Sequence, residues 1–175
     1  MLLLASILIA SCSTSIKIIQ PKGKYPTPPI ITTSSKSFDQ VWDGIIDFFA
    51  QNGVPIKIID KSSGLIISEQ SKLKWSYEKP DGSLYLPSAY AVLPKIMKPM
   101  SSTNWYSPEN VTGEWNVRIK KMPDGTTSIN VNLYNIQALF GRTYYSEYLH
   151  TMVEPVKLDA KTTGNFEMAI ENMVK

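Results

Sequence analysis

The sequence has little of the chemistry on which most catalytic and metal-binding sites depend. Its 175 residues include a single cysteine, Cys12, and a single histidine, His150. One cysteine cannot form an internal disulfide, and a zinc site needs several nitrogen or sulfur ligands. We therefore expect no metal site and no cofactor.

Charge is also sparse and nearly balanced. Charged residues make up 19% of the chain, and 18 basic against 15 acidic residues leave a net charge of +3. They are spread along the sequence without the lysine and arginine cluster that marks nucleic-acid binding. A nucleic-acid partner is therefore not expected, whereas an apolar fraction of 43% is enough to fill the core of one domain.

Long apolar runs are missing as well, apart from a short one at the start. Residues 1–10 (MLLLASILIA) carry no charge and are shorter than the roughly 20 residues that cross a bilayer. Their length fits the apolar region of a secretory signal peptide. The segment 9–12 (IASC) resembles the lipobox of bacterial lipoproteins. By that resemblance residues 1–11 are a signal peptide and Cys12 is the lipid-bearing first residue of the mature protein; the alternative is a buried N-terminal strand.

The residue after the cysteine bears on the location of such a lipoprotein. Ser13 stands where an aspartate commonly signals retention in the inner membrane of enteric bacteria. The resemblance therefore implies an outer-membrane lipoprotein whose domain faces the periplasm. The first expected partner is the membrane itself, through the lipid on Cys12.

Residues 12–35 are predicted to be a tether between the lipid and the domain. This segment has four prolines and many serines and threonines but no sustained periodicity, which is the composition of a semi-extended linker. The apolar pairs Ile18–Ile19 and Ile30–Ile31 leave open the alternative that parts of the segment dock on the domain.

Residues 36–175 are predicted to form one domain that begins and ends with a helix. Ser37 and Gln40 match a capping box, apolar residues follow at spacings of three and four, and Asn52-Gly53 supplies the stop. Near the C-terminus Thr163 is a candidate N-cap. The apolar residues that follow it at helical spacing are Phe166, Ala169, Ile170, Met173 and Val174.

Two hairpins are predicted between these helices. The first joins the β-branched run 54–60 to residues 65–75 through a Ser-Ser-Gly turn. The second is stronger, because apolar and polar residues alternate strictly over 115–120 and 128–133 on either side of a Pro-Asp-Gly turn. Such alternation indicates one face in the core and one in solvent.

These elements predict an α+β fold, in which an antiparallel sheet of about four or more strands packs on an N-terminal and a C-terminal helix. The residues that we expect to be buried together are Trp42, Ile45, Phe49, Val117, Ile119, Ile129, Val131, Phe166 and Ile170.

A family likeness supports the same fold class. Residues 37–43 (SFDQVWD), Gly53 and residues 58–67 (IIDKSSGLII) resemble the opening of BamC-like lipoprotein domains, in which a helix precedes two strands joined by a similar turn. Residues 162–167 (TTGNFE) resemble the start of the last helix in bacterial lipoproteins of the same layout. The resemblance implies a helix-grip-like fold and an accessory or scaffold role at the cell envelope, and no catalytic residues come with it.

Catalytic constellations are missing from the rest of the chain. Ser146, Glu147 and His150 lie too close together on one segment to form a catalytic triad, and no nucleophile elbow is present. An enzyme is therefore not predicted.

The segment 77–111 is the most distinctive part of the domain. It has five prolines, is rich in aromatic residues and methionine, and is much longer than an ordinary loop. Long loops with aromatic residues often bind partners. The candidate partner-binding residues are Tyr85, Tyr90, Met97, Met100, Trp105 and Tyr106. The alternative is that they form a satellite core, and the same two interpretations apply to a second aromatic group, Phe140, Tyr144, Tyr145 and Tyr148.

Two functions are consistent with these observations. The first is a lipid-anchored, non-enzymatic envelope lipoprotein, an accessory or protein-interaction module that docks on another envelope protein through its aromatic loops. The alternative is a binder of a small apolar ligand between helix and sheet, although side chains as large as Trp42 and Trp115 favour a filled interior.

Overall fold

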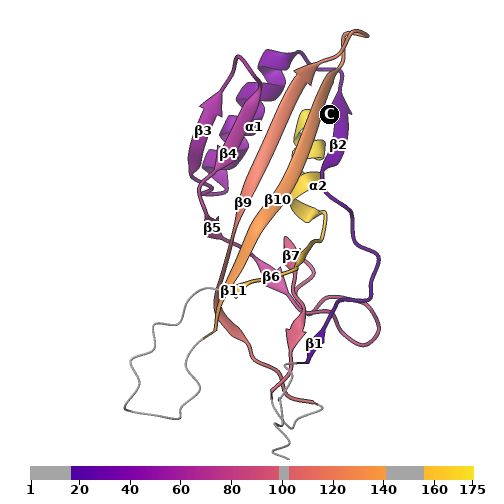
Figure 1. The fold of residues 1–175 in the computed structure, drawn as a ribbon. Helices are drawn as coiled ribbons and strands as arrows, with labels where there is room; N and C mark the ends of the chain where they lie inside the picture. The colour runs from indigo at the N-terminus through magenta and orange to yellow at the C-terminus, as the bar shows by residue number, and fades with distance from the viewer. Residues whose placement is uncertain (1–16, 99–102, 141–155) are drawn as a thin grey trace, which may run out of the picture.

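The computed structural model describes residues 17–98, 103–140 and 156–175. Strands make up 43% and helices 17% of the structure. The molecule is elongated (Figure 1). One end holds two helices and most of a large antiparallel sheet, and the other end holds short strands from the N-terminal segment and the insertion.

A long hairpin forms the centre of the main sheet. Its strands are β9 (Pro108–Lys121) and β10 (Thr127–Phe140), which pair along most of their length. All other strands of this sheet also pair antiparallel: β4 (Leu65–Ser68) and β5 (Ser71–Lys72) with β9, β3 (Ile56–Asp60) with β4, and β2 (Ile30–Ser34) and β11 (Val156–Lys157) with β10.

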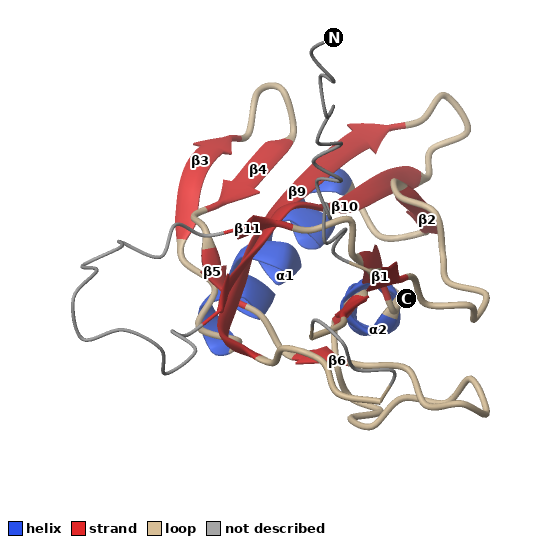
Figure 2. Cartoon of the chain, turned by 60° about the horizontal axis from the view of Figure 1, so that its bottom comes forward, coloured by secondary structure: helices blue, strands red, loops and turns tan. Residues whose placement is uncertain are grey.

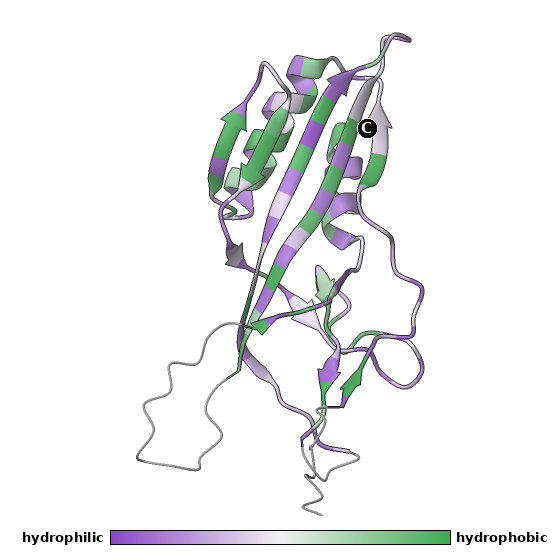
Figure 3. Cartoon of the chain, in the orientation of Figure 1, coloured by the Kyte–Doolittle hydropathy of each residue, from purple (hydrophilic) through white to green (hydrophobic). Residues whose placement is uncertain are grey.

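The alternation of side chains explains the length of this hairpin. Polar and apolar residues alternate along both strands, as the banding in Figure 3 shows. Cross-strand pairs on the inner face, such as Val117 with Val131 and Ile119 with Ile129, are buried. The ladder shifts register after Tyr134, where Asn135 has a φ of 51°, as expected at a β-bulge.

Both helices lie on one face of the main sheet (Figure 2). The first, α1 (Phe38–Gln51), begins with the predicted capping box, which is confirmed by the Ser37–Gln40 hydrogen bonds, and ends at Asn52. Lys61, in the turn between β3 and β4, binds Asp39 of the first helical turn at 2.9 Å. That turn needs Gly64, because its φ is 69° and a Cβ atom would collide with the carbonyl oxygen of Ile119.

The second helix, α2 (Asn165–Val174), begins one residue later than predicted. Its N-cap is Gly164, with a φ of 85°, and no side chain caps it. The Thr163 hydroxyl instead donates to the carbonyl of Ala89 and accepts the N–H of Asn165. Thr163 therefore joins the helix to the insertion.

The core lies between the helices and the inner face of the main sheet. Trp115 of β9 and Phe166 of α2 stack with ring centroids 3.7 Å apart, and Phe48 and Phe49 of α1 meet Phe166 edge-on. All nine residues predicted to be buried together belong to this cluster, so that prediction is confirmed. The stacked pair occupies space between helix and sheet where the alternative function would place an apolar ligand.

Two smaller sheets complete the fold. β6 (Trp75–Ser76), β7 (Ala91–Val92) and β12 (Lys161–Thr162) form a three-stranded sheet below the core, and β1 (Ile18–Ile19) pairs with β8 (Lys95–Ile96) at the far end. The predicted strand over 65–75 is therefore wrong in detail, because the chain divides there into β4, β5 and the start of β6.

The predicted fold class is wrong. The structure is mostly β, with two helices beside a large multi-strand antiparallel sheet, and is not the helix-grip or BamC-like α+β fold with a helix at each end. Two features account for the difference. The two central strands have 14 residues each, more than twice the length of the alternating runs 115–120 and 128–133, and β1 and β2 precede the first helix.

The predicted tether also has to be corrected. Ile30–Ser34 forms strand β2 of the main sheet, and Ile18–Ile19 pairs with β8, so the alternative of docking on the domain is confirmed for both apolar pairs. Backbone hydrogen bonds to neighbouring strands hold the segment that its composition marked as a linker. Among the residues described, no helix is long and apolar enough to cross a membrane.

Candidate functional site

The insertion brings three aromatic rings together around one lysine. The ammonium group of Lys95 lies 4.5 Å from the ring centre of Trp105, 5.8 Å from that of Tyr85 and 6.0 Å from that of Tyr77. All three distances are within the range of cation–π attraction. We call these four residues the aromatic–lysine cluster.

Tyr77 is the fixed centre of this cluster. Its ring meets Trp75 and Trp105 edge-on at 5.2 and 5.9 Å, and its hydroxyl donates to the carbonyl oxygen of Tyr106 at 2.8 Å. Burial raises the pKa of Tyr77 to about 12, so the hydroxyl stays a donor at physiological pH. A buried ring with a satisfied hydroxyl holds its neighbours in place.

Two short backbone ladders carry the outer members of the cluster. Tyr85 donates its N–H to the carbonyl of Tyr77, closing a narrow loop whose turn Asp81 stabilises by accepting from Ser83. Trp105 lies opposite Met97 in a β-bridge next to β8. Residues far apart in the sequence are thus held on adjacent backbone segments.

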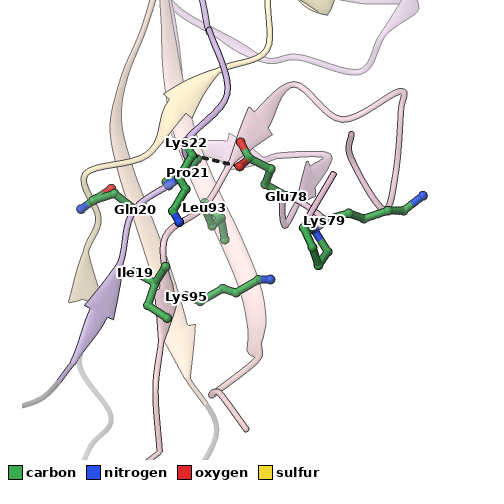
Figure 4. Close-up of a pocket in the computed structure, with 9 residues that line it drawn as sticks. Ile19, Gln20, Pro21, Lys22, Glu78, Lys79, Leu93 and Lys95 are labelled. Atoms are coloured by element: carbon green, nitrogen blue, oxygen red, sulfur yellow. Dashed lines mark hydrogen bonds between the residues drawn. The ribbon is translucent and has the colours of Figure 1, made fainter. Parts of the chain in front are cut away.

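A cavity of about 260 Å³ lies beside the cluster and shares Lys95 with it. Figure 4 shows its lining, which comes from both the N-terminal segment and the insertion. The apolar lining includes Ile19, Pro21 and Leu93, and the polar lining includes Lys22, Glu78 and Lys95. Apolar walls with a few charged groups are typical of binding sites.

Glu78 joins the two segments that line the cavity. Its carboxylate accepts from the backbone N–H groups of Lys22 and Gly23 at 3.0 and 2.7 Å, and from the Tyr25 hydroxyl at 2.7 Å. Burial alone would raise the pKa of Glu78, but these hydrogen bonds and nearby Lys161 lower it overall. The carboxylate therefore stays ionised and its oxygens are occupied within the domain.

The structure separates the predicted site residues. Tyr85 is 55% exposed, whereas Trp105 and Tyr106 are partly buried. Tyr90 packs edge-on against Trp115 and Phe166, and Met97 is buried, as the satellite-core alternative expected. Phe140, of the second aromatic group, is also partly buried against the core. The predicted residues outside the described part of the chain are Cys12, Met100, Tyr144, Tyr145, Ser146, Glu147, Tyr148 and His150.

The sequence reasoning missed the charged members of the site. Lys95, Lys22 and Glu78 were not singled out, because each is an ordinary charged residue in its local sequence. Their roles depend on contacts between the N-terminal segment and the insertion, which local patterns do not encode. The one available signal was the apolar pair Ile18–Ile19, which indicated that this segment could dock.

A second polar feature lies at the start of α2. Glu167 is only 3% exposed, and one of its carboxylate oxygens accepts from the Thr162 hydroxyl at 2.8 Å while the other has no hydrogen-bond partner within the described residues. Burial raises the pKa of this carboxyl. It borders a cavity of about 140 Å³ between α2 and β2, lined among others by Pro26, Thr32 and Met168.

The aromatic–lysine cluster presents ring faces and a cation beside a cavity, which is the chemistry of a binding surface. In the described part of the chain no three His, Cys, Asp or Glu residues come close enough together to hold a metal ion. No protein-family model matches the chain, and no curated protein matches it.

Proposed function

We propose that this protein is a lipid-anchored, non-enzymatic accessory module of the bacterial cell envelope, held at the outer membrane by Cys12, that docks on another envelope protein through the aromatic–lysine cluster. The observation that carries the docking surface is the exposure of Tyr85 beside Lys95, Tyr77 and Trp105. The lipid anchor rests on the lipobox resemblance alone.

Pre-organisation makes this surface suitable for a partner. Tyr85 is 55% and the neighbouring Leu86 is 43% exposed, while the backbone and rings beneath them are fixed by hydrogen bonds and edge-on packing. Immobilising flexible side chains opposes association, so a surface that is already ordered loses less on binding. Tyr and Trp are also the residues most enriched at binding hot spots.

The docking surface is tested by Tyr85→Ala combined with Leu86→Ala. We expect affinity for the partner recovered from solubilised envelopes to fall about thirtyfold, the equivalent of a hot-spot loss of about 2 kcal/mol. The unfolding free energy should change by less than about 0.5 kcal/mol, because both side chains are exposed.

The matched control is Met122→Ala, in the turn between β9 and β10, where the side chain is 41% exposed at the opposite end of the molecule. It should leave partner recovery unchanged. An equal loss of partner affinity with Met122→Ala, or no loss of affinity with the Tyr85→Ala and Leu86→Ala double variant, would contradict docking at the cluster. A substitution of Trp105 would also affect folding, because its ring packs on Tyr77.

The anchor is tested separately with Cys12→Ser. The variant should leave the membrane fraction or remain uncleaved, because it has no thiol to receive lipid. Mass spectrometry of the native protein should find Cys12 as a lipid-modified N-terminus. An intact Met1 terminus with an unmodified Cys12 would overturn the anchor without affecting the docking test.

A further inference from the structure

The described chain enters the domain at the end that holds β1 and β8. Lys17, the first described residue, accepts the N–H of Met97 at 2.9 Å through its carbonyl oxygen, and Ile18 pairs with Ile96. This end lies farthest from the turn between β9 and β10 (Figure 1). Lys17 is therefore held at this end of the domain.

This entry point limits how far the domain can lie from a lipid on Cys12. Lys17 follows Cys12 by five positions, and five fully extended residues span about 17 Å at most. The predicted tether of residues 12–35 would have allowed a much larger separation. Because Ile18–Ile19 and Ile30–Ser34 pair with strands of the domain, a lipid on Cys12 would hold Lys17, at the β1–β8 end, within that distance of the anchor.

The same end carries exposed lysines and an exposed apolar side chain. Lys17, Lys22 and Lys98 are exposed, and Ile18 beside them is 53% exposed. Lys98 lies over the ring of Tyr106 at 5.7 Å. We call Lys17, Ile18, Lys22, Lys98 and Tyr106 the lysine tip.

Glu78 is the one carboxylate among the residues that line the cavity, so it offsets only part of the positive charge of the three lysines and leaves the tip cationic. Glu78 accepts three hydrogen bonds from the domain itself, two of them from the backbone at Lys22 and Gly23. Its oxygens therefore hold the N-terminal segment on the domain, while Lys17 and Lys98 are exposed to solvent.

We infer that the lysine tip binds anionic phospholipid headgroups, so that the domain is held with the β1–β8 end against the membrane. Lysines near an anionic bilayer surface are attracted to it, and tyrosine and apolar side chains insert at the headgroup level. The inference deepens the proposed function and rests on its lipid anchor for the geometry in the cell. The lipid affinity of the tip can be measured without the anchor.

The first experiment uses the full chain with Cys12→Ser and sedimentation with vesicles. Binding should be stronger to vesicles of mixed phosphatidylglycerol and phosphatidylcholine than to phosphatidylcholine alone, and should weaken as salt is raised. Replacing Lys17, Lys22 and Lys98 by Gln should lower the affinity for the anionic vesicles by about fivefold per lysine, roughly a hundredfold in total.

The control replaces three exposed lysines of the helix–sheet part of the molecule, Lys57, Lys120 and Lys121, by Gln. Net charge then falls equally in both variants, and the apolar residues 1–11 contribute equally to the vesicle binding of each. Unchanged binding of this control supports the lysine tip. Equal loss in both variants, or equal binding to both kinds of vesicle, would overturn the inference.

A second experiment separates this inference from the anchor. The native protein in anionic vesicles is labelled with an amine-reactive reagent, and protection of Lys17 and Lys98 is compared with that of Lys120 and Lys121. Protection confined to the tip supports membrane contact. Tip lysines labelled as fast as the control lysines in a protein shown to be lipidated would overturn membrane contact while leaving the anchor intact, and they would favour an acidic protein as the occupant of the tip.

Discussion

The helix–sheet end and the insertion end of this molecule use aromatic residues in opposite ways. Trp115, Phe49 and Phe166 are fully buried at the first end, where regular helices and strands meet. At the second, Tyr85 is exposed and Trp105 is partly buried, both near Lys95. Similar rings thus stabilise the fold at one end and form a polar-edged surface at the other. The difference lies in the backbone, which forms regular helices and long strands at the first end and loops with short strands at the second.

The largest expected effect comes from the helix–sheet end. Phe166→Ala removes a ring that stacks on Trp115 and meets Phe48, Phe49 and Tyr90 edge-on, so it should lower the unfolding free energy by about 3–5 kcal/mol. Urea denaturation measures this directly. A loss below about 1 kcal/mol would mean that the two ends do not differ in this way.

A buried hydroxyl should give the next largest effect. Ser68 is fully buried, accepts the N–H of Trp115 at 2.8 Å and donates to the carbonyl of Glu69. Ser68→Ala leaves that N–H without its partner, which should cost about 1–3 kcal/mol in urea denaturation. Ser71→Ala is the control, because Ser71 donates to the same carbonyl but is more exposed. Similar losses in both variants would contradict the role of burial.

The smallest expected effect is a change in pH dependence at Glu167. Burial raises the pKa of this carboxyl in the folded state. The protonated carboxyl therefore contributes its full stability below the ordinary carboxyl pKa, and this contribution is lost as pH rises through the pKa of the folded state. Glu167→Gln stays neutral, so its stability relative to the parent should increase as pH rises over that range.

Thermal unfolding of parent and variant from acidic to neutral pH measures this difference. Glu109→Gln, at an exposed position near the start of β9, serves as the control for the loss of one carboxyl group from the chain. A stability difference between Glu167→Gln and the parent that stays constant with pH would mean that the Glu167 carboxyl has the same pKa in the folded and unfolded states.

The parts of the fold that could be predicted are those encoded by neighbours in the sequence. The Ser37–Gln40 capping box, the turn at Gly64 and the alternation around Val117 and Val131 each depend on residues within one element or one hairpin. The pairing of Ile30–Ser34 with β10 joins segments almost a hundred residues apart and has no local signature. That non-local pairing is one reason why the predicted fold class was wrong.

The candidate site follows the same division. Tyr85 and Trp105 were predicted as candidate partner-binding residues, because aromatic residues stand out in a long proline-rich loop. Lys95 could not be predicted, since its importance comes from rings contributed by three separate parts of the insertion. Tyr90 and Met97 share the composition of their neighbours but turn inward, and only the fold separates them.

The β9–β10 hairpin also sets a length. Each strand has 14 residues, and at about 3.3 Å per residue the ribbon extends for roughly 46 Å. A hydrogen-bonded hairpin that packs against two helices moves as one unit, so a force applied at one end tilts the whole molecule and does not bend it. The bulge at Asn135 interrupts the ladder and adds a local twist to the ribbon. If the lysine tip were fixed on a surface, the hairpin would hold the turn at Gly125 at a fixed distance from that surface.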